Sequence, residues 1–275
     1  MQLFQVIFIL ITFSFIEIFG DEVQEIVPVP PLNYTKPPYS VKIVGGSPAR
    51  LHQFPWQASI TSCEGGSCYI CGGSLISKRY VLTAAHCAAG LTRFVIGLGS
   101  NSRNRPAVTL TSNIKVVHPQ YDAKSLGNDV AVIKLPWSVK LNKAIQPIIL
   151  PRSNNTYDNA NATVSGYGKT SAWSSSSDQL NFVDMRIISN GQCREIFGSV
   201  IRDSSLCAVG KNLSRQNVCQ GDSGGPLVVK EGNSTVQVGV VSFVSAAGCA
   251  AGYPSGYARV SSFYEWIANM TDIDL

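Results

Sequence analysis

The chain has 275 residues, 45% of them apolar and 14% charged, which is enough apolar material for a sizeable core in one or two domains. Its formal net charge of +5 is scattered, without a basic helix or a basic patch interleaved with aromatic residues. This pattern excludes the usual nucleic-acid-binding classes and indicates a mildly basic, solvated surface. The 24 glycines and the many short runs rich in Val, Ile and Thr predict an all-β fold with frequent turns.

Residues 1–20 are largely apolar and end at the small residue Gly20, just before the charged pair Asp21-Glu22. This pattern predicts a secretory signal peptide and therefore a secreted, extracellular protein. The start of the segment departs from the usual pattern, because it has no Lys or Arg. An uncleaved membrane anchor is the alternative, but the apolar run is shorter than the ~20 residues that a spanning helix needs.

Residues 21–42 are rich in proline and predict an extended, exposed activation propeptide that builds no core. They end at Lys42, which precedes Ile43-Val44-Gly45-Gly46. A single basic residue on an accessible stretch suits cleavage by a trypsin-like protease, which would make Ile43 the new N-terminus. The alternative is that Lys42 is only a charge in a linker.

The rest of the chain reads as short strands separated by turns until about residue 260. Near the end, apolar residues recur at helical spacing: Phe263, Trp266, Ile267 and Met270 occupy positions i, i+3, i+4 and i+7. This spacing predicts a helix over residues 261–270, with packing as its role.

Three segments carry residue types suited to nucleophilic catalysis. Ser223 lies in Cys219-Gln220-Gly221-Asp222-Ser223-Gly224-Gly225-Pro226, where glycines allow a tight turn that presents a hydroxyl and backbone N–H groups. His86 lies in Thr83-Ala84-Ala85-His86-Cys87, and Asp129 enters an apolar strand after Gly127-Asn128. The serine segment alone could be an ordinary glycine-rich turn, but the order His86, Asp129, Ser223 is one of the known chain orders of a Ser-His-Asp triad.

From Ile43 to its C-terminus the chain resembles the chymotrypsin-type serine endopeptidases. The resemblance rests on the three segments above and on Ile43-Val44-Gly45-Gly46, Pro55-Trp56-Gln57 and Cys71-Gly72-Gly73-Ser74-Leu75-Ile76. Ser242-Phe243 through Gly248-Cys249 and Gly252-Tyr253-Pro254 are most similar to the arthropod digestive branch of chymotrypsins, elastases and brachyurins. The resemblance implies an all-β fold of two six-stranded antiparallel Greek-key β-barrels, at about 43–150 and 151–260, followed by the C-terminal helix. The triad would then meet in the cleft between the two barrels.

The resemblance also implies a role for each site residue. Ser223 would attack the substrate, His86 would transfer the proton and Asp129 would orient His86. The backbone N–H groups of Gly221 and Ser223 would form the oxyanion hole. Ser242, at the start of the substrate-binding strand, would also contact the Asp129 carboxylate.

A further implication concerns activation. In the family, the ammonium of the new N-terminus, here Ile43, pairs with the aspartate before the nucleophile, here Asp222. A buried carboxylate without a partner is costly, so we expect the pocket and the oxyanion hole to become ordered when that cation arrives.

All eight cysteines follow residue 62, an even number that suits a disulfide framework in an oxidising compartment. The resemblance selects Cys71–Cys87, Cys193–Cys207 and Cys219–Cys249. Cys63 and Cys68 then remain for a fourth bridge that closes a hairpin. Zinc binding is the alternative use of the cysteines, but no Cys/His cluster has ligand spacing.

Substrate specificity rests on residues aligned with the family's primary pocket. Asn217 stands where trypsins carry an aspartate, Val244 where an open pocket usually has glycine, and Ser255 where brachyurins often carry an aspartate. None of them is charged, so a Lys or Arg side chain would be buried without a partner. We expect cleavage after small to medium apolar residues, with Phe, Tyr and Leu as the close alternative.

No cofactor is expected, and no metal, because the loop in which relatives bind calcium falls at residues 99–112 and has no acid. The expected partners of this secreted monomer are protein or peptide substrates, an activating trypsin-like protease and protein protease inhibitors, with no nucleic acid and no membrane in the mature form. The alternatives to a digestive enzyme are a regulatory cascade protease and a catalytically inactive binding protein of the same fold. Six sequons are glycosylation candidates: Asn33, Asn154, Asn161, Asn212, Asn233 and Asn269.

Overall fold

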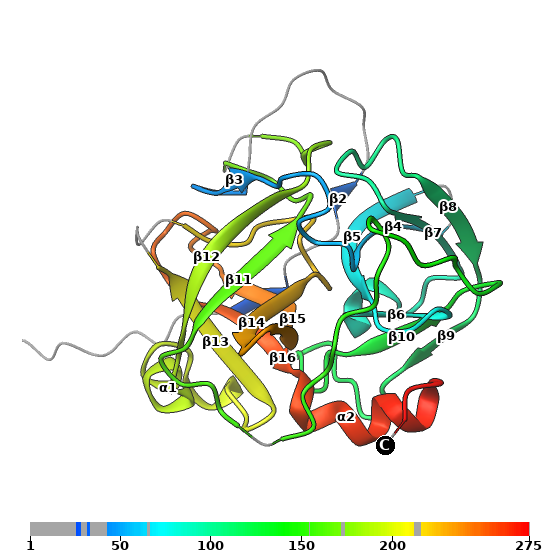
Figure 1. Cartoon of the computed structure of the whole chain (residues 1–275). Helices are drawn as coiled ribbons and strands as arrows, with labels where there is room; N and C mark the ends of the chain where they lie inside the picture. Colours follow the sequence, from blue (N-terminus) through cyan, green and yellow to red (C-terminus); the bar gives the residue numbers. More distant parts are fainter. Residues whose placement is uncertain are drawn as a thin grey trace, which may run out of the picture.

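A computed structural model describes residues 26–28, 32–33, 43–64, 67–153, 155–171, 174–211 and 216–274. The predicted signal peptide and Lys42 lie outside these residues. The described chain is built mainly of antiparallel strands in two sheets that lie side by side, with a C-terminal helix along one edge of both (Figure 1).

The first sheet has the strand order β8-β7-β4-β5-β6-β10-β9, and β2 pairs with β5 outside this path. Its strands are β2 (Leu32–Asn33), β4 (Gln57–Glu64), β5 (Ser67–Leu75), β6 (Tyr80–Thr83), β7 (Arg93–Leu98), β8 (Val108–Ser112), β9 (Lys115–Val117) and β10 (Ala131–Lys134).

The second sheet has the order β1-β15-β14-β11-β12-β13-β16, and β16 also pairs with β15, which closes a six-stranded barrel. β3 is added to β12. The strands are β1 (Ile26–Pro28), β3 (Ser47–Pro48), β11 (Asn161–Gly166), β12 (Asn181–Ile188), β13 (Ser205–Gly210), β14 (Pro226–Glu231), β15 (Ser234–Ser245) and β16 (Ser255–Arg259).

The chymotrypsin-like all-β fold is confirmed, with one difference in the first sheet, whose described ladder stays open between β8 and β9. β8 and β9 follow each other in the chain but do not pair with each other. The end of β8 and the residue before β9 are instead held by hydrogen bonds to Lys134 of β10. Ser112 Oγ donates to the carbonyl of Lys134 at 2.5 Å, and Lys134 N donates to the carbonyl of Ile114 at 3.0 Å.

The start of the predicted protease domain lies against the second sheet, although the sequence places it in the first barrel. Ile43 and Val44 are buried in the core of the second sheet, and β3 pairs with β12. Residues 43–48 thus bring the predicted new N-terminus into the body that carries Ser223. Only from β4 onward does the chain enter the first sheet.

Two short parts of the proline-rich segment, residues 26–28 and 32–33, are described as strands. β1 and β2 are extended, as expected, and each pairs with the edge of a sheet, which the sequence did not predict. Proline favours extended backbone, and two sheet edges supply the hydrogen-bond partners that an isolated extended chain lacks.

The two α-helices differ in how well the sequence predicts them. α2 (Val260–Met270) confirms the expected C-terminal helix and buries Phe263 and Ile267. α1 (Asn190–Phe197) was not expected, and it begins with a capping box between Ser189 and Gln192. Short 3-10 turns lie at η1 (Ala85–Cys87) and η2 (Gly198–Val200). No helix in the part of the chain described is long and apolar enough to cross a membrane.

All four predicted disulfides are present. Cys63 and Cys68 face each other on β4 and β5 and close that hairpin. Cys71–Cys87 ties β5 to η1. The other two, Cys193–Cys207 and Cys219–Cys249, stabilise the second sheet and its loops. Every cysteine of the chain is therefore bridged.

Buried polar contacts join the two sheets. Ser74 Oγ of β5 donates to Gln237 Oε1 of β15 at 2.6 Å, and Ser165 Oγ of β11 donates to Gln57 Oε1 of β4 at 2.7 Å. All four side chains are buried. The apolar core of the first sheet also continues into the second through Val228, Val240 and Ala258. The two sheets therefore share the apolar cluster at their junction, and the second barrel also has a core of its own.

Candidate active site

His86 is the middle residue of η1, the short turn that follows β6. Its neighbours Ala85 and Cys87 are buried, and Cys87 is bridged to β5, so the turn has little freedom. His86 Nδ1 lies 2.8 Å from Asp129 Oδ2, and the backbone N of His86 donates to Asp129 Oδ1 at 2.9 Å. Both carboxylate oxygens of Asp129 thus hold one residue, which fixes the ring and directs Nε2 away from Asp129.

Asp129 lies just before β10 and is 1% exposed. Asn128, with φ of 55°, turns the chain so that Asp129 points back toward η1. Ser242 Oγ of β15 donates to Asp129 Oδ2 at 2.6 Å, as predicted. The contact joins the acid of the first sheet to a strand of the second, and it helps to compensate a buried charge.

Ser223 lies in a tight turn between two glycines with positive φ, Gly221 at 95° and Gly224 at 77°. A Cβ on Gly224 would lie 2.1 Å from Thr83 Oγ1, so the turn fits against the strand before His86 only without a side chain there. The carbonyl of Ser223 accepts from Gly72 N at 2.7 Å. These contacts place the Ser223 turn against Thr83 and Ala84, just before the turn that carries His86.

Asp222 points the other way, into the second barrel, and is fully buried. Its carboxylate accepts from Gly168 N at 2.8 Å and from Cys219 N at 3.0 Å. Burial raises the pKa of Asp222 to about 7, partly offset by these two backbone hydrogen bonds. No ion pair of Asp222 with a side-chain cation is present among the described residues. The carboxylate is therefore placed to receive a cation.

We expect this buried acid to make the stability of the uncleaved chain depend on pH. Because its pKa is about 7 in the folded chain and 3.8 otherwise, the folded state binds the proton more tightly between these values. The free energy of unfolding should fall as the pH rises from about 4 to about 7, by up to about 4 kcal/mol. Urea unfolding at each pH measures this free energy, in Ser223→Ala protein so that the chain cannot digest itself. Asp222→Asn should flatten the curve in this window, and an equal slope in both proteins would contradict the assignment.

The three predicted pocket residues are buried and uncharged. Asn217 Nδ2 donates to the carbonyl of Tyr253 at 3.0 Å, and its Oδ1 accepts from Val218 N at 2.9 Å. Ser255 Oγ lies 2.9 Å from the hydroxyl of Tyr257, and Val244 is 1% exposed. The amide and the hydroxyl are thus already engaged within the protein.

The sequence did not single out Thr83, Gly168 or Tyr257, although each contacts a predicted site residue. Thr83 Oγ1 donates to the carbonyl of Gly72 at 2.8 Å beside the nucleophile turn. Gly168 receives Asp222, and a Cβ there would lie 2.5 Å from its carboxyl carbon. Tyr257 could have been found, because it lies two residues after Ser255 on a strand and so shares its face. Gly168 gave no such signal, since its role depends on a long-range contact.

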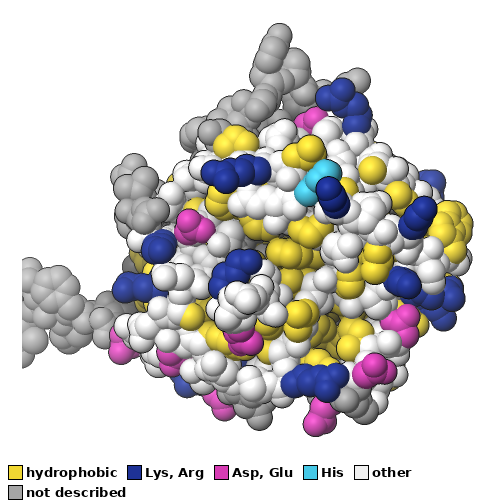
Figure 2. All heavy atoms as spheres, in the orientation of Figure 1, with side chains coloured by type: hydrophobic (Ala, Val, Ile, Leu, Met, Phe, Trp, Pro, Cys, Tyr) yellow, Lys and Arg dark blue, Asp and Glu magenta, His cyan; other side chains and the backbone are white. Residues whose placement is uncertain are grey.

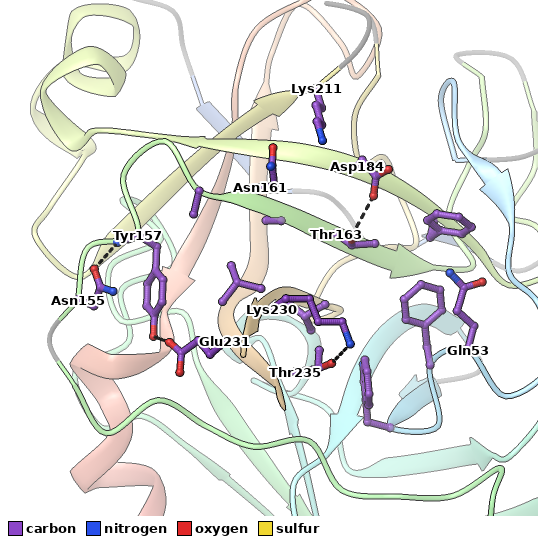
Figure 3. A pocket seen from close by; sticks show the side chains of 17 residues that line it. Gln53, Asn155, Tyr157, Asn161, Thr163, Asp184, Lys211, Lys230, Glu231 and Thr235 are labelled. Carbon is purple, nitrogen blue, oxygen red and sulfur yellow. Dashed lines mark hydrogen bonds between the residues drawn. The ribbon is translucent and has the colours of Figure 1, made fainter. Parts of the chain in front are cut away.

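A separate hollow of about 670 Å³ lies on the second barrel (Figure 3). Its polar contacts are internal: Tyr157 donates to Glu231 at 2.6 Å and Lys230 donates to Thr235 at 2.6 Å. Figure 2, seen from the same side as Figure 1, shows hydrophobic side chains near the middle of the molecule's face, with Lys and Arg side chains around them. None of the predicted catalytic residues lines the hollow.

Three of the glycosylation candidates can be placed. Asn161, Asn233 and Asn269 are exposed, as glycan attachment requires. Asn161 also borders the hollow on the second barrel. Asn154, Asn212 and the side chain of Asn33 lie outside what the structure describes.

Known proteins match the chain in sequence and in fold. Residues 43–267 match the family model described as Trypsin. The chain is 39% identical over 236 residues to a brachyurin of Leptuca pugilator, covering 84% of this chain and 99% of the relative. It is 36% identical over 237 residues to a collagenase of Hypoderma lineatum, covering 84% and 88%. A chymotrypsin of Phaedon cochleariae is 34% identical over 245 residues, covering 87% and 86%.

A solved structure of HL collagenase, 36% identical to the chain, superposes with a TM-score of 0.78 and covers 85% of this chain and 100% of its own. The chain therefore belongs to the trypsin family, and it is a serine endopeptidase of the chymotrypsin type.

Proposed function

We propose that the mature protein hydrolyses peptide bonds through His86, Asp129 and Ser223, after uncharged apolar residues, and that cleavage after Lys42 activates it. One observation carries the proposal: the hydrogen-bonded chain from Ser242 through Asp129 to His86 ends beside the glycine-flanked turn of Ser223. This arrangement would supply a nucleophile, a base and an orienting acid from two sheets that pack against each other.

In the proposed mechanism, Asp129 accepts from Nδ1 of His86, which leaves Nε2 as the basic nitrogen. Nε2 takes the proton from Ser223 Oγ as the oxygen attacks the substrate carbonyl, and later gives it to the leaving amine. Asp129 stabilises the imidazolium that forms. Its own charge is held by the backbone N of His86 and by Ser242 Oγ, so it remains an acceptor throughout.

The oxyanion of the tetrahedral intermediate would be held by the N–H groups of Gly221 and Ser223. Each such donor is worth ~3 kcal/mol in the transition state. Gly221 has φ of 95°, a conformation that turns the backbone before the nucleophile and that other residues rarely adopt. The turn is packed against Gly168, 3.0 Å from where a Cβ on Gly221 would lie, which limits the space in which the two donors can move.

Activation would use the buried carboxylate of Asp222. Cleavage after Lys42 by a trypsin-like protease would create an ammonium on Ile43. The side chain of Ile43 is already buried in the second barrel, and its neighbour Val44 forms an isolated β-bridge with Asn217. Pairing of this ammonium with Asp222 would stabilise the charged carboxylate that burial disfavours.

The setting we propose is extracellular. All eight cysteines are bridged, which suits an oxidising compartment. Relatives named collagenase and chymotrypsin support an enzyme that acts on protein substrates. We further propose that it is a digestive monomer that protein inhibitors control.

Primary specificity gives the test of this function. We expect cleaved protein to hydrolyse matched peptides ending in Ala, Val or Leu at least about a hundredfold better than the Arg peptide, because an unpaired buried cation costs several kcal/mol. The measurement is kcat/KM for each peptide. Efficient cleavage after Arg would contradict the neutral pocket.

The size limit has a separate control. Val244→Gly should raise kcat/KM for the Phe peptide relative to the Ala peptide, because it removes bulk from the expected pocket wall. If Phe is already preferred and Val244→Gly changes nothing, the small-pocket assignment fails while the neutral pocket stands.

A further inference from the structure

Two short strands of the N-terminal segment lie on sheet edges beside the active site. β1 pairs antiparallel with residues 243–245 of β15 in the second sheet. β2 pairs antiparallel with residues 69–70 of β5 in the first sheet. Residues 26–28 thus pair with the second sheet, and residues 32–33, a few positions later in the chain, pair with the first.

Both sheet edges lie close in sequence to residues that hydrogen-bond to Asp129 or to Ser223. Residue 243 follows Ser242, whose Oγ contacts Asp129 at 2.6 Å. Residue 70 lies two positions before Gly72, whose N–H donates to the carbonyl of Ser223 at 2.7 Å. The two strands therefore pair with parts of β15 and β5 that lie within two positions of residues contacting Asp129 and Ser223.

We propose that residues 26–33 are a built-in competitive inhibitor, which occupies these two edges in the uncleaved chain and rebinds to them after release. The inference rests on the proposed endopeptidase function. An extended peptide bound to a sheet edge uses the edge's backbone N–H and carbonyl groups, so two peptides cannot share that edge. A substrate held along β15 must displace β1.

The composition of the segment favours binding. Prolines at 28, 30 and 31 restrict the backbone to extended conformations, so little conformational freedom is lost when the segment pairs. Proline lacks an N–H and is accepted at sheet edges, and Pro28 lies at the last position of β1.

The same prolines protect the segment from the enzyme. The sequence from residue 28 to residue 32 is Pro-Val-Pro-Pro-Leu, so each of its four peptide bonds has proline on at least one side. Where proline supplies the leaving nitrogen of the peptide bond, that nitrogen carries the ring carbon Cδ in place of a hydrogen. The extra carbon disfavours cleavage of that bond. Where proline supplies the carbonyl, it cannot donate a hydrogen bond to the β15 edge. Residues 29–31 lie outside the described residues, so the protection follows from their sequence alone.

The test adds a synthetic peptide of residues 21–42 to protease that was cleaved after Lys42 and freed of its N-terminal segment. We expect the peptide to raise KM for a chromogenic substrate without changing kcat, and to remain uncut between residues 28 and 32 by mass spectrometry. A peptide of residues 34–42, which lacks both strands, should not inhibit. Binding of each peptide to the Ser223→Ala variant, by calorimetry, gives a readout that does not need activity.

Two N-methylated peptides test the strand pairing. Neighbouring residues of an antiparallel strand direct their N–H groups alternately toward and away from the partner. N-methylation at Val27 or at Ile26 should therefore weaken binding by about tenfold at one position and little at the other. Equal effects at both positions would contradict pairing with β15.

A Pro30→Ala peptide tests the protection. It leaves the bond between Val29 and residue 30 without proline on either side, so the inhibitor should become a substrate cut at that bond. Lack of binding to the Ser223→Ala protein, or cleavage of the unchanged peptide between residues 28 and 32, would overturn the proposal. Absence of any peptidase activity would instead refute the proposed function, and the binding result would still decide the docking.

Discussion

Replacing Ser223 with alanine should lower kcat roughly a millionfold, because no other group can take the acyl intermediate. His86→Ala should cost about as much, and the double variant should be no worse than either single one, since the two act as a unit. Asp129→Asn should cost about ten-thousandfold, because the amide favours the wrong tautomer of His86.

Single-turnover and steady-state kinetics on one peptide measure these losses, and binding of a peptide inhibitor checks that the site remains folded. Ser242→Ala is the matched control. It removes one hydrogen bond to Asp129 and leaves the backbone N of His86 as a partner, so it should cost only about tenfold. Hydrolysis by Ser223→Ala within tenfold of the parent would mean that the site is elsewhere.

The second large effect concerns the ammonium of Ile43. Lys42→Gln should leave the protein uncleaved and inactive after treatment with a trypsin-like protease, while Lys36→Gln, the matched change in the same segment, should activate normally. In the cleaved protein, Asp222→Asn should lower kcat/KM about a thousandfold, because the Ile43 ammonium then lies buried without its counter-charge.

N-terminal sequencing of active material decides the position of the cut. A first residue other than Ile43 would contradict the assignment. So would full activity of cleaved Asp222→Asn protein, since a fully buried carboxylate with a pKa near 7 would then have no part in ordering the site.

The catalytic segments and the disulfides could be predicted because their information is local or carried by spacing. The pairing of Cys63 with Cys68 is an example: four residues separate them, and the structure places them opposite each other on β4 and β5. The contact of Ser242 with Asp129 was expected from the resemblance and is also found.

Other features depend on long-range contacts that no local pattern reveals. Residues 43–48 lie on the second sheet because β3 finds its partner in β12, more than a hundred positions later in the chain. Gly168 was missed for the same reason, as it matters only through Asp222. α1 is a different case, because its capping box of Ser189 and Gln192 is a local sequence signal. The helix that follows has only eight residues, too few for a clear apolar periodicity.

The polar contacts between the sheets have a consequence for how the molecule loses its structure. Ser74–Gln237 and Ser165–Gln57 are buried side-chain hydrogen bonds, and breaking either without water nearby would leave polar groups unsatisfied at ~1–3 kcal/mol each. Opening the junction would also expose the apolar interior that the two sheets share. We therefore expect the two sheets to unfold together rather than one after the other. Heating should accordingly keep the catalytic geometry intact up to one cooperative transition of the whole protease body.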